Sequence, residues 1–222
     1  MRTVVSPFYG LSFAAGCVDA ISFVGFRGVF TANMTGNTVL LGIALASRFG
    51  AVPRNLGIVP PLIAIAAFVV GAIAALPVFR AKVDARRAAV IVAAESVLVA
   101  LASVAFGGFA EGFVVPLCIV LVSFSMGAQS VVASKAGLAG ISTTYVTGTL
   151  VTAITRGLAG GSDGGARRQA ARAAWAWTAY LAGAAMGTLL LIVLHRAALW
   201  PAAFLFLALA AWLDRSRPDF RG

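Results

Sequence analysis

The sequence has few charged residues and almost no cysteine or histidine. Only 11% of its 222 residues are Asp, Glu, Lys or Arg, whereas about a quarter are charged in soluble domains. Two cysteines, Cys17 and Cys118, and the single His195 cannot form a disulfide framework or a metal cluster. No nucleophile–histidine–acid triad or Gly-rich phosphate loop can be assembled either. We therefore expect no conventional enzyme, no nucleotide-driven pump, and neither a metal nor a cofactor.

Apolar residues, in contrast, are abundant. They make up 61% of the chain, and the mean hydropathy is +0.98. A soluble domain could not cover this much apolar side chain, which excludes a soluble enzyme, a nucleic-acid-binding protein and a disordered scaffold as first interpretations. The net charge of +10, from 17 Lys and Arg against 7 Asp and Glu, is typical of the positive-inside bias of membrane proteins. The expected partner is a lipid bilayer rather than nucleic acid.

The apolar residues fall into eight stretches. Most are long enough, at 1.5 Å per residue, to cross a hydrocarbon layer of about 30 Å. Residues 37–48 and 148–159 are exceptions, because a helix of twelve residues reaches only about 18 Å. Each is preceded by Gly with Ser, Thr or Asn, which favour turns and helix caps over lipid-facing surface. The stretches are about 8–25, 37–48, 60–79, 88–109, 112–134, 148–159, 173–194 and 197–213.

Matching motifs recur at an offset of 111 or 112 residues, half the length of the chain. We therefore expect two repeats, 1–110 and 111–222, in one integral membrane domain. Ala14 to Cys17 faintly resemble the end of a lipoprotein signal, but the repeat places their counterpart in mid-chain, which favours a span. The matches are Gly16 to Asp19 with Gly127 to Ser130, Thr35-Gly36 with Thr147-Gly148, and Gly71 with Gly183.

The distribution of basic residues favours one topology. If both short stretches cross the membrane fully, Lys and Arg divide 10 to 7 between the two sides. If both are re-entrant, six spans remain, and 13 basic residues lie on the side of the termini against 4 on the other. We therefore predict an all-α bundle of about six spans with two half-helix segments, and cytoplasmic termini. Three spans per repeat invert the second repeat, so the short helices would meet near the midplane, as in transporters and channels.

Two acidic residues are expected inside the membrane. Asp19 lies within the first long stretch, where a carboxylate costs about 2.5–3.5 kcal/mol on insertion scales and should face the bundle interior. It is either a proton-coupling or cation-contacting group, or a structural acceptor that holds the Asn33/Thr35 loop or pairs with Arg27. Glu95 is the second acid, and a snorkelling or interhelical pairing role is its structural alternative.

The segments before the short helices predict a polar site at the midplane. Thr or Asn can cap free N–H groups there, and a helix N-terminus favours an anion or a polar oxygen. The alternative is that these side chains only cap one another. The candidates for the solute or ion path are Asp19, Asn33, Thr35, Gly36, Asn37, Glu95, Gln129, Ser130, Thr144, Tyr145, Thr147, Gly148 and Thr149.

The first half also resembles a known family. The segments Gly16-Cys-Val-Asp19-Ala20 and Met34-Thr35-Gly36-Asn37 are similar to the signature of the YoaK family of bacterial integral-membrane proteins, and the resemblance extends loosely over nearly the whole chain. It implies a protein of about six spans in the bacterial inner membrane and brings no substrate with it. The second half has Thr147-Gly148-Thr149 and lacks the Asn, which weakens a symmetric site.

Transport is the function that these patterns favour. We expect a transporter or channel for a small polar or anionic solute. Transport coupled to protons is one version of this hypothesis, and the protein could act as a homo-oligomer. The first alternative is a membrane subunit or assembly factor that transports nothing. The second is an intramembrane enzyme acting on lipid, for which the sequence offers no nucleophile–base pair or metal set.

Overall fold

The computed structural model describes residues 6–50, 57–79, 84–108, 111–136, 146–158 and 164–216, and all regular structure within these ranges is helical. The expectation of an all-α protein is confirmed. The α-helices are α1 (Ser6–Gly25), α2 (Met34–Ala46), α3 (Val59–Ala75), α4 (Ala85–Gly108), α5 (Glu111–Lys135), α6 (Val146–Leu158), α7 (Gly164–Leu194) and α8 (Trp200–Ser216), with short 3₁₀ turns η1 (Leu76–Phe79) and η2 (His195–Ala197).

Five helical segments are long and apolar enough to cross a membrane by length and composition. These spans are Pro7–Gly25, Val59–Val78, Ala85–Gly108, Gly112–Lys135 and Gly164–Ala197, and α2 is a shorter apolar helix. Large apolar side chains are also exposed around the bundle, among them Phe49 at 93% and Val193 at 71%. Exposed large apolar side chains of this kind fit a lipid environment. The chain is therefore a multi-pass membrane protein.

Two helices begin earlier than the hydropathy pattern predicts. α2 starts at Met34 rather than at residue 37, and α7 starts at Gly164 rather than at residue 173. The added first turns of α7 contain Ala, Arg and Gln, which are good helix formers although they are not all apolar. Hydropathy detects the part of a helix that suits lipid, whereas helix formation continues beyond it.

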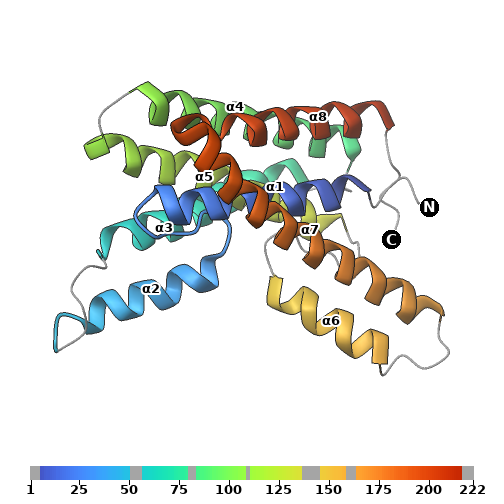
Figure 1. The fold of residues 1–222 in the computed structure, drawn as a ribbon. Helices are drawn as coiled ribbons and strands as arrows, with labels where there is room; N and C mark the ends of the chain where they lie inside the picture. Colours follow the sequence, from blue (N-terminus) through green and yellow to red (C-terminus); the bar gives the residue numbers. More distant parts are fainter. Residues whose placement is uncertain are drawn as a thin grey trace.

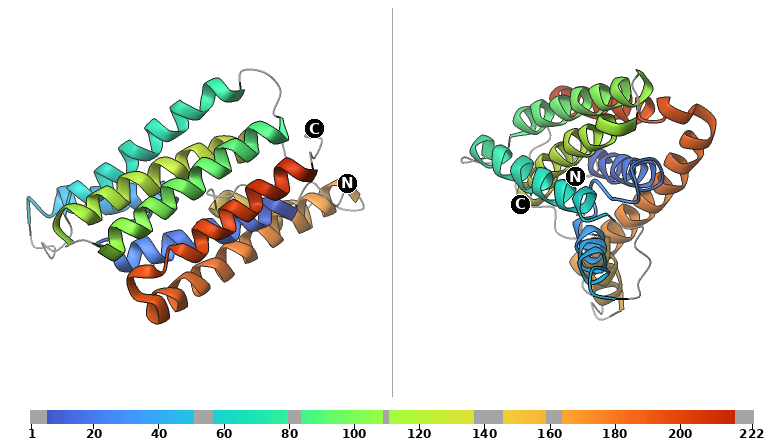
Figure 2. Two further views of the ribbon diagram at one scale, coloured as in Figure 1. Left: turned by 90° about the horizontal axis from the view of Figure 1, so that it is seen from above. Right: turned by 90° about the vertical axis from the view of Figure 1, so that its left-hand side faces the viewer.

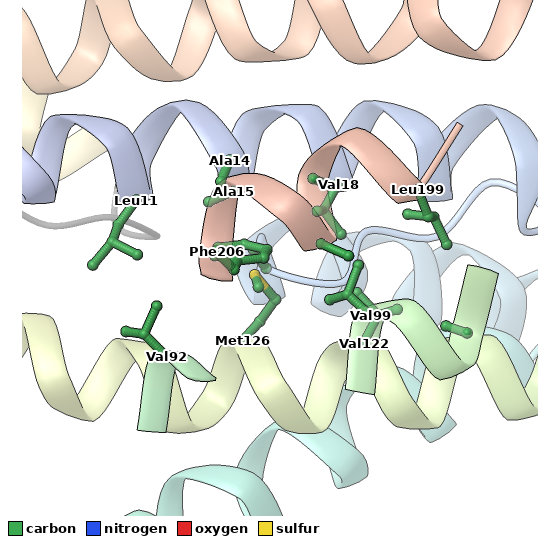
Figure 3. Packing of buried hydrophobic residues seen from close by; sticks show 14 of the residues in the cluster. Leu11, Ala14, Ala15, Val18, Val92, Val99, Val122, Met126, Leu199 and Phe206 are labelled. Carbon is green, nitrogen blue, oxygen red and sulfur yellow. The ribbon is translucent and has the colours of Figure 1, made fainter. Parts of the chain in front are cut away.

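The helices pair in a regular pattern. α1 packs along α7, α3 along α5, α4 along both α5 and α8, and the short helices α2 and α6 along α3 and α7. Side chains of α1, α4, α5 and α8 form the buried apolar core (Figure 3). There, Phe206 of α8 lies between Ala14 and Ala15 of α1 and Met126 of α5 (Figure 3). All four side chains are fully buried.

Glycines allow the backbones of the paired helices to touch. A Cβ at Gly16 of α1 would overlap the carbonyl oxygen of Tyr180 in α7, and one at Gly183 would overlap that of Phe13. The α3 and α5 helices approach each other in the same way, because a Cβ at Gly71 or Gly127 would overlap the backbone of the opposite helix. Small residues permit the close approach on which helix association in lipid depends.

The short helices lie end to end on one side of the bundle. Figure 1 shows α1, α4 and α7 running from right to left, and α3, α5 and α8 running from left to right. α2 and α6 both start in the middle of the bundle and run outward in opposite directions, so that their N-termini face each other (Figure 1). In the end-on view of Figure 2 the two helices overlap. Each has 13 residues, or about 20 Å of helix.

Candidate functional site

Asp19 joins α1 to the loop that precedes α2 and to α7. Its side chain is 2% exposed. Oδ1 accepts hydrogen bonds from the backbone N–H groups of Thr31 (2.8 Å) and Ala32 (2.6 Å). The hydroxyl of Tyr180 in α7 donates to Oδ2. Hydrogen bonds to a charged acceptor contribute about 1.5–3 kcal/mol each, so this carboxylate holds three parts of the chain together.

The loop from Phe26 to Asn33 turns sharply before it meets Asp19. Arg27 and Gly28 both have positive φ (62° and 75°), a conformation that glycine adopts readily and other residues rarely. The ring of Phe30 stacks on that of Phe23, with centroids 4.7 Å apart. Arg27 is exposed, and among the described contacts it forms no ion pair with Asp19, so that alternative is not what the structure shows.

Two asparagines fix the start of α2. Asn33 is the N-cap, and its Oδ1 accepts a hydrogen bond from the N–H of Gly36 at 3.1 Å. Asn37, which is fully buried, pairs with both backbone groups of Phe30. Its Oδ1 accepts from the Phe30 N–H at 2.9 Å, and its Nδ2 donates to the Phe30 carbonyl at 2.6 Å. The amide of Asn37 thus takes the place of a backbone partner in the middle of the bundle.

The other residues of the Thr-Gly-Asn motif have distinct positions. Thr35 is exposed in the first turn of α2. A Cβ at Gly36 would lie 2.8 Å from the ring of Phe30, which is too close for any larger residue unless the ring moves. The motif therefore combines a close approach at Gly36 with an amide at Asn37 that fixes the loop, directly after the Asn33 cap.

The facing end of α6 supplies the second group of candidates. Thr147 is exposed, Gly148 is half-buried and Thr149 is 3% exposed in the first turn of α6. The predicted site residues Thr144 and Tyr145 lie outside the described residues. The N-terminal turns of α2 and α6 point toward each other (Figure 1), and the N-terminus of a helix carries a partial positive charge.

The candidates on α5 connect inward to other helices or to α5 itself. Gln129 is fully buried, and its Nε2 donates to the carbonyl of Leu11 in α1 at 3.4 Å. Its Oε1 has no hydrogen-bond partner among the described residues. Ser130 is half-buried, and its hydroxyl donates to the carbonyl of Met126 at 2.8 Å. Gln129 therefore links α5 to α1 through Nε2, and its Oε1 remains available as an acceptor.

Glu95 lies apart from this group. Its side chain is 1% exposed, and neither carboxyl oxygen has a hydrogen-bond partner among the described residues. It lines a cavity of about 150 Å³ formed by α3, α4 and α5. None of the candidates on α1, α2 or α6 lines that cavity. The structure thus separates the two intramembrane acids into different sites.

Tyr180 belongs to this candidate site, and the sequence did not predict it. A buried carboxylate requires donors, and Tyr180 is the donor from a helix 161 residues away in the chain. The signal was a phenol within an otherwise apolar span, but no local spacing links it to Asp19. Among the described residues, no group of three His, Cys, Asp or Glu could hold a metal ion.

Comparisons with known proteins identify the family to which the chain is similar. A family model described as a protein of unknown function, DUF1275, matches residues 8–212. The chain is also 41% identical over 142 residues to the UPF0700 transmembrane protein YoaK of Bacillus subtilis (strain 168). That alignment covers 63% of this chain and 61% of the relative, so the match spans about three fifths of the relative's length. No solved structure matches the chain.

Proposed function

We propose that this chain, which belongs to the DUF1275 family, moves a small polar or anionic solute across the bacterial inner membrane as a secondary transporter or a channel. The observation that carries the proposal is that two half-length helices on one side of the bundle face each other, N-terminus to N-terminus (Figure 1). Discontinuous helices whose positive ends converge at the midplane are a recurring design for binding polar and anionic groups.

Equivalent contacts in the two halves support an inverted repeat. The α1–α7 and α3–α5 contacts correspond at the offset of 111 or 112 seen in the sequence: Gly16 meets Tyr180 where Gly127 meets Phe68, and Gly183 meets Phe13 where Gly71 meets Phe124. The opposite directions of α2 and α6 fit the same relation (Figure 1). Six spans and two half-helices, with cytoplasmic termini, are the topology we propose.

The polar groups at the junction define the proposed path. N–H groups at the starts of α2 and α6, together with the hydroxyls of Thr35 and Thr147, would contact the solute. Asn37 would hold the α2 end rigidly through its two bonds to Phe30. Non-helical backbone at this depth is tolerated only where protein or a water-filled cavity satisfies it. The proposal assigns no catalytic reaction and no nucleic-acid partner to the chain.

Binding and flux measurements test the proposal. Purified protein is screened by thermal shift against small carboxylates, phosphate, sulfate and neutral polyols, and the solutes that stabilise it are then followed into proteoliposomes. We expect Thr147→Val to weaken binding of such a solute about tenfold, which corresponds to about 1.4 kcal/mol. Thr155→Val is the matched control, because the Thr155 hydroxyl lies on the same helix and donates to Val151.

One observation favours a second candidate function. Both oxygens of Asp19 are engaged by Thr31, Ala32 and Tyr180, as in a purely structural polar centre. A subunit or assembly factor that transports nothing would need such a centre and no path. That function predicts no stabilisation by any solute in the panel, no flux, and reproducible co-purification of another membrane protein. These results together would overturn the transport proposal.

A further inference from the structure

Glu95 occupies a cavity that the proposed solute path does not use. The cavity, of about 150 Å³, is lined mainly by apolar side chains of α3, α4 and α5. Leaving a buried polar group unpaired is costly, and a lone carboxylate in such surroundings costs far more than a neutral acid. A fully buried glutamate therefore needs either a bound proton or a cationic partner to neutralise it.

The described surroundings of Glu95 contain no such partner in the protein. No other lining residue is ionisable, and the one lining hydroxyl, that of Ser125, donates to the carbonyl of Val122. One basic side chain contacts the lining: Arg87 donates to the carbonyl of Val78, which lines the cavity. On α8, the charged residues Asp214 and Arg215 lie in the last turn.

The second half of the chain has a buried residue at the position equivalent to Glu95. Buried positions of α4 match those of α8 at a constant offset of 111, and Glu95 corresponds to Phe206. Phe206 fills the core between α1 and α5 (Figure 3). The matched buried pairs are Ala88 with Leu199, Val92 with Ala203, Glu95 with Phe206, Val99 with Ala210, and Ala102 with Leu213.

The comparison of Glu95 with Phe206 shows that packing alone does not require an acid at this position. In α8 an apolar ring fills the space, whereas in α4 a carboxyl stands beside an open cavity. A cavity of this size has room for several water molecules, since a water needs only about 10–15 Å³ of such volume. Water beside the Glu95 carboxyl would provide the hydrogen-bond partners that the lining lacks and a route for proton transfer.

We infer that the carboxyl of Glu95 is a proton-exchange site in the cavity between α3, α4 and α5. The carboxylic acid gives its proton to a water molecule in the cavity, forming carboxylate and hydronium, and the reverse step restores it. Only a proton moves, so no oxidant or further reactant is needed. Proton exchange at Glu95 does not depend on the proposed transport function. Only the use of this proton to drive solute movement rests on that proposed function.

Carbodiimide labelling tests the site. Dicyclohexylcarbodiimide is apolar and enters membranes, and it adds to a protonated carboxyl group. The acid proton passes to a carbodiimide nitrogen, the carboxyl oxygen bonds to the central carbon, and acyl transfer to nitrogen gives a stable N-acylurea. Membranes containing the full chain are labelled between pH 5 and 9, and the modified residue is identified by peptide mass spectrometry.

We expect Glu95 to be modified at low pH and the modification to fall as pH rises. Glu95→Gln should remove it. Asp19→Asn should leave it unchanged, because Asp19 lies in a different site. Labelling of Glu95 only after the chain is unfolded in detergent would overturn the inference, and so would labelling that does not vary with pH.

A second measurement separates this inference from the transport proposal. The infrared carbonyl band of a protonated carboxyl group should be lost in Glu95→Gln and should titrate in the wild type, whether or not any solute binds. Glu95→Leu, which replaces the acid by an apolar side chain as at Phe206, should fold and show a higher Tm than the wild type. Absence of solute binding with a titrating Glu95 would overturn only the proposed function, whereas an infrared band unchanged by Glu95→Gln would overturn only this inference.

Discussion

Asp19 accepts hydrogen bonds from three donors that lie in two separate parts of the chain. Two are consecutive backbone N–H groups of the loop before α2, and the third is the phenol of Tyr180 in α7. The hydroxyls of Ser22 and Thr31, 3.3 Å apart, lie beside them. A carboxylate can accept all of these bonds at once, which a neutral side chain of similar size cannot do equally well. Asp19 therefore positions the loop that leads into α2.

Substitutions at Asp19 should differ in severity. Asp19→Ala leaves two buried N–H groups and the partly buried Tyr180 hydroxyl unpaired, at about 1–3 kcal/mol each, so we expect it to lower the free energy of unfolding by several kcal/mol. Asp19→Asn keeps an oxygen for the Thr31 and Ala32 N–H groups and should cost about 1–3 kcal/mol. Unfolding in detergent micelles measures both. Equal losses for the two variants would show that the loop bonds contribute little.

Asn37 should matter for the local order of the same loop. Asn37→Leu removes both bonds to the backbone of Phe30 while keeping a similar volume, and we expect a loss of about 2 kcal/mol and faster proteolysis of the loop. Thr38→Val is the control, since the exposed Thr38 hydroxyl bonds only to Met34 within its own helix. A control as sensitive to protease as Asn37→Leu would contradict this role.

Single residues also show where sequence reasoning reaches its limit. The burial of Asp19 and the capping chemistry around Asn33 follow from local pattern, because a charge in a span must face inward and a cap lies next to its helix. Tyr180 could not be paired with Asp19 in this way, since contacts between distant helices leave no spacing rule. Nor could the lack of a partner at Glu95 be foreseen, because it depends on every side chain around it.

Helices in this protein approach each other through glycine. In α1 and α7, Gly16 and Gly183 each face backbone of the opposite helix. The sequence contains a Gly183–Gly187 spacing that suits either dimerisation or internal packing, and the structure places both glycines against α1. Close backbone contact strengthens van der Waals packing, which is the main attraction between helices where no hydrophobic effect acts.

Adding one methyl group at these crossings should separate the helices. We expect Gly16→Ala to destabilise the protein by several kcal/mol or to prevent folding, because the new Cβ would overlap the carbonyl oxygen of Tyr180. Gly42→Ala in α2 is the control, since a Cβ there meets nothing within 4 Å and improves helix propensity. The Tm and the yield of monodisperse protein measure the effect. Similar behaviour of the two variants would contradict the packing described here.

The helices themselves were largely predictable. All described helices except the turns at their ends match apolar stretches of the sequence, and the two short stretches correspond to α2 and α6. The errors lie at helix starts, where Met34 and Gly164 begin turns that hydropathy does not detect. The membrane family indicated by the Met34-Thr35-Gly36-Asn37 segment is confirmed by the family match over residues 8–212.

The arrangement of the whole bundle makes a prediction about sidedness. If α2 and α6 are half-helices, both ends of each broken segment reach the same face of the membrane. Cysteines introduced one at a time at Arg27 and Phe49 should then react with an impermeant maleimide from one side, and those at Lys135 and Leu158 from the other. All four positions are exposed, and Cys17 and Cys118 are both buried and can be replaced by Ala.

This labelling also tests the inverted repeat that we propose. Arg27 and Phe49 reacting from opposite sides would show that α2 crosses the membrane fully, and the midplane junction would then not exist. The sequence could indicate two repeats through its matches at 111 and 112 residues. It could not indicate that α1 packs on α7 and α5 on α3, because exchange of helices between halves is a property of the assembled bundle.

The bond between Asp19 and Tyr180 has a consequence for biosynthesis. At about 5–20 residues per second, a ribosome needs roughly 10–30 s to add the 161 residues that separate the two. The Thr31 and Ala32 N–H groups are added within 13 residues of Asp19. The loop after α1 can therefore form hydrogen bonds to the Asp19 carboxylate as soon as it is made. The phenol is added only after α7 has begun to be made, so the hydrogen bond that joins α7 to Asp19 forms much later than those of the loop. Docking of α7 on α1 would thus be a late step in the assembly of these helices, completed by the Tyr180 hydroxyl.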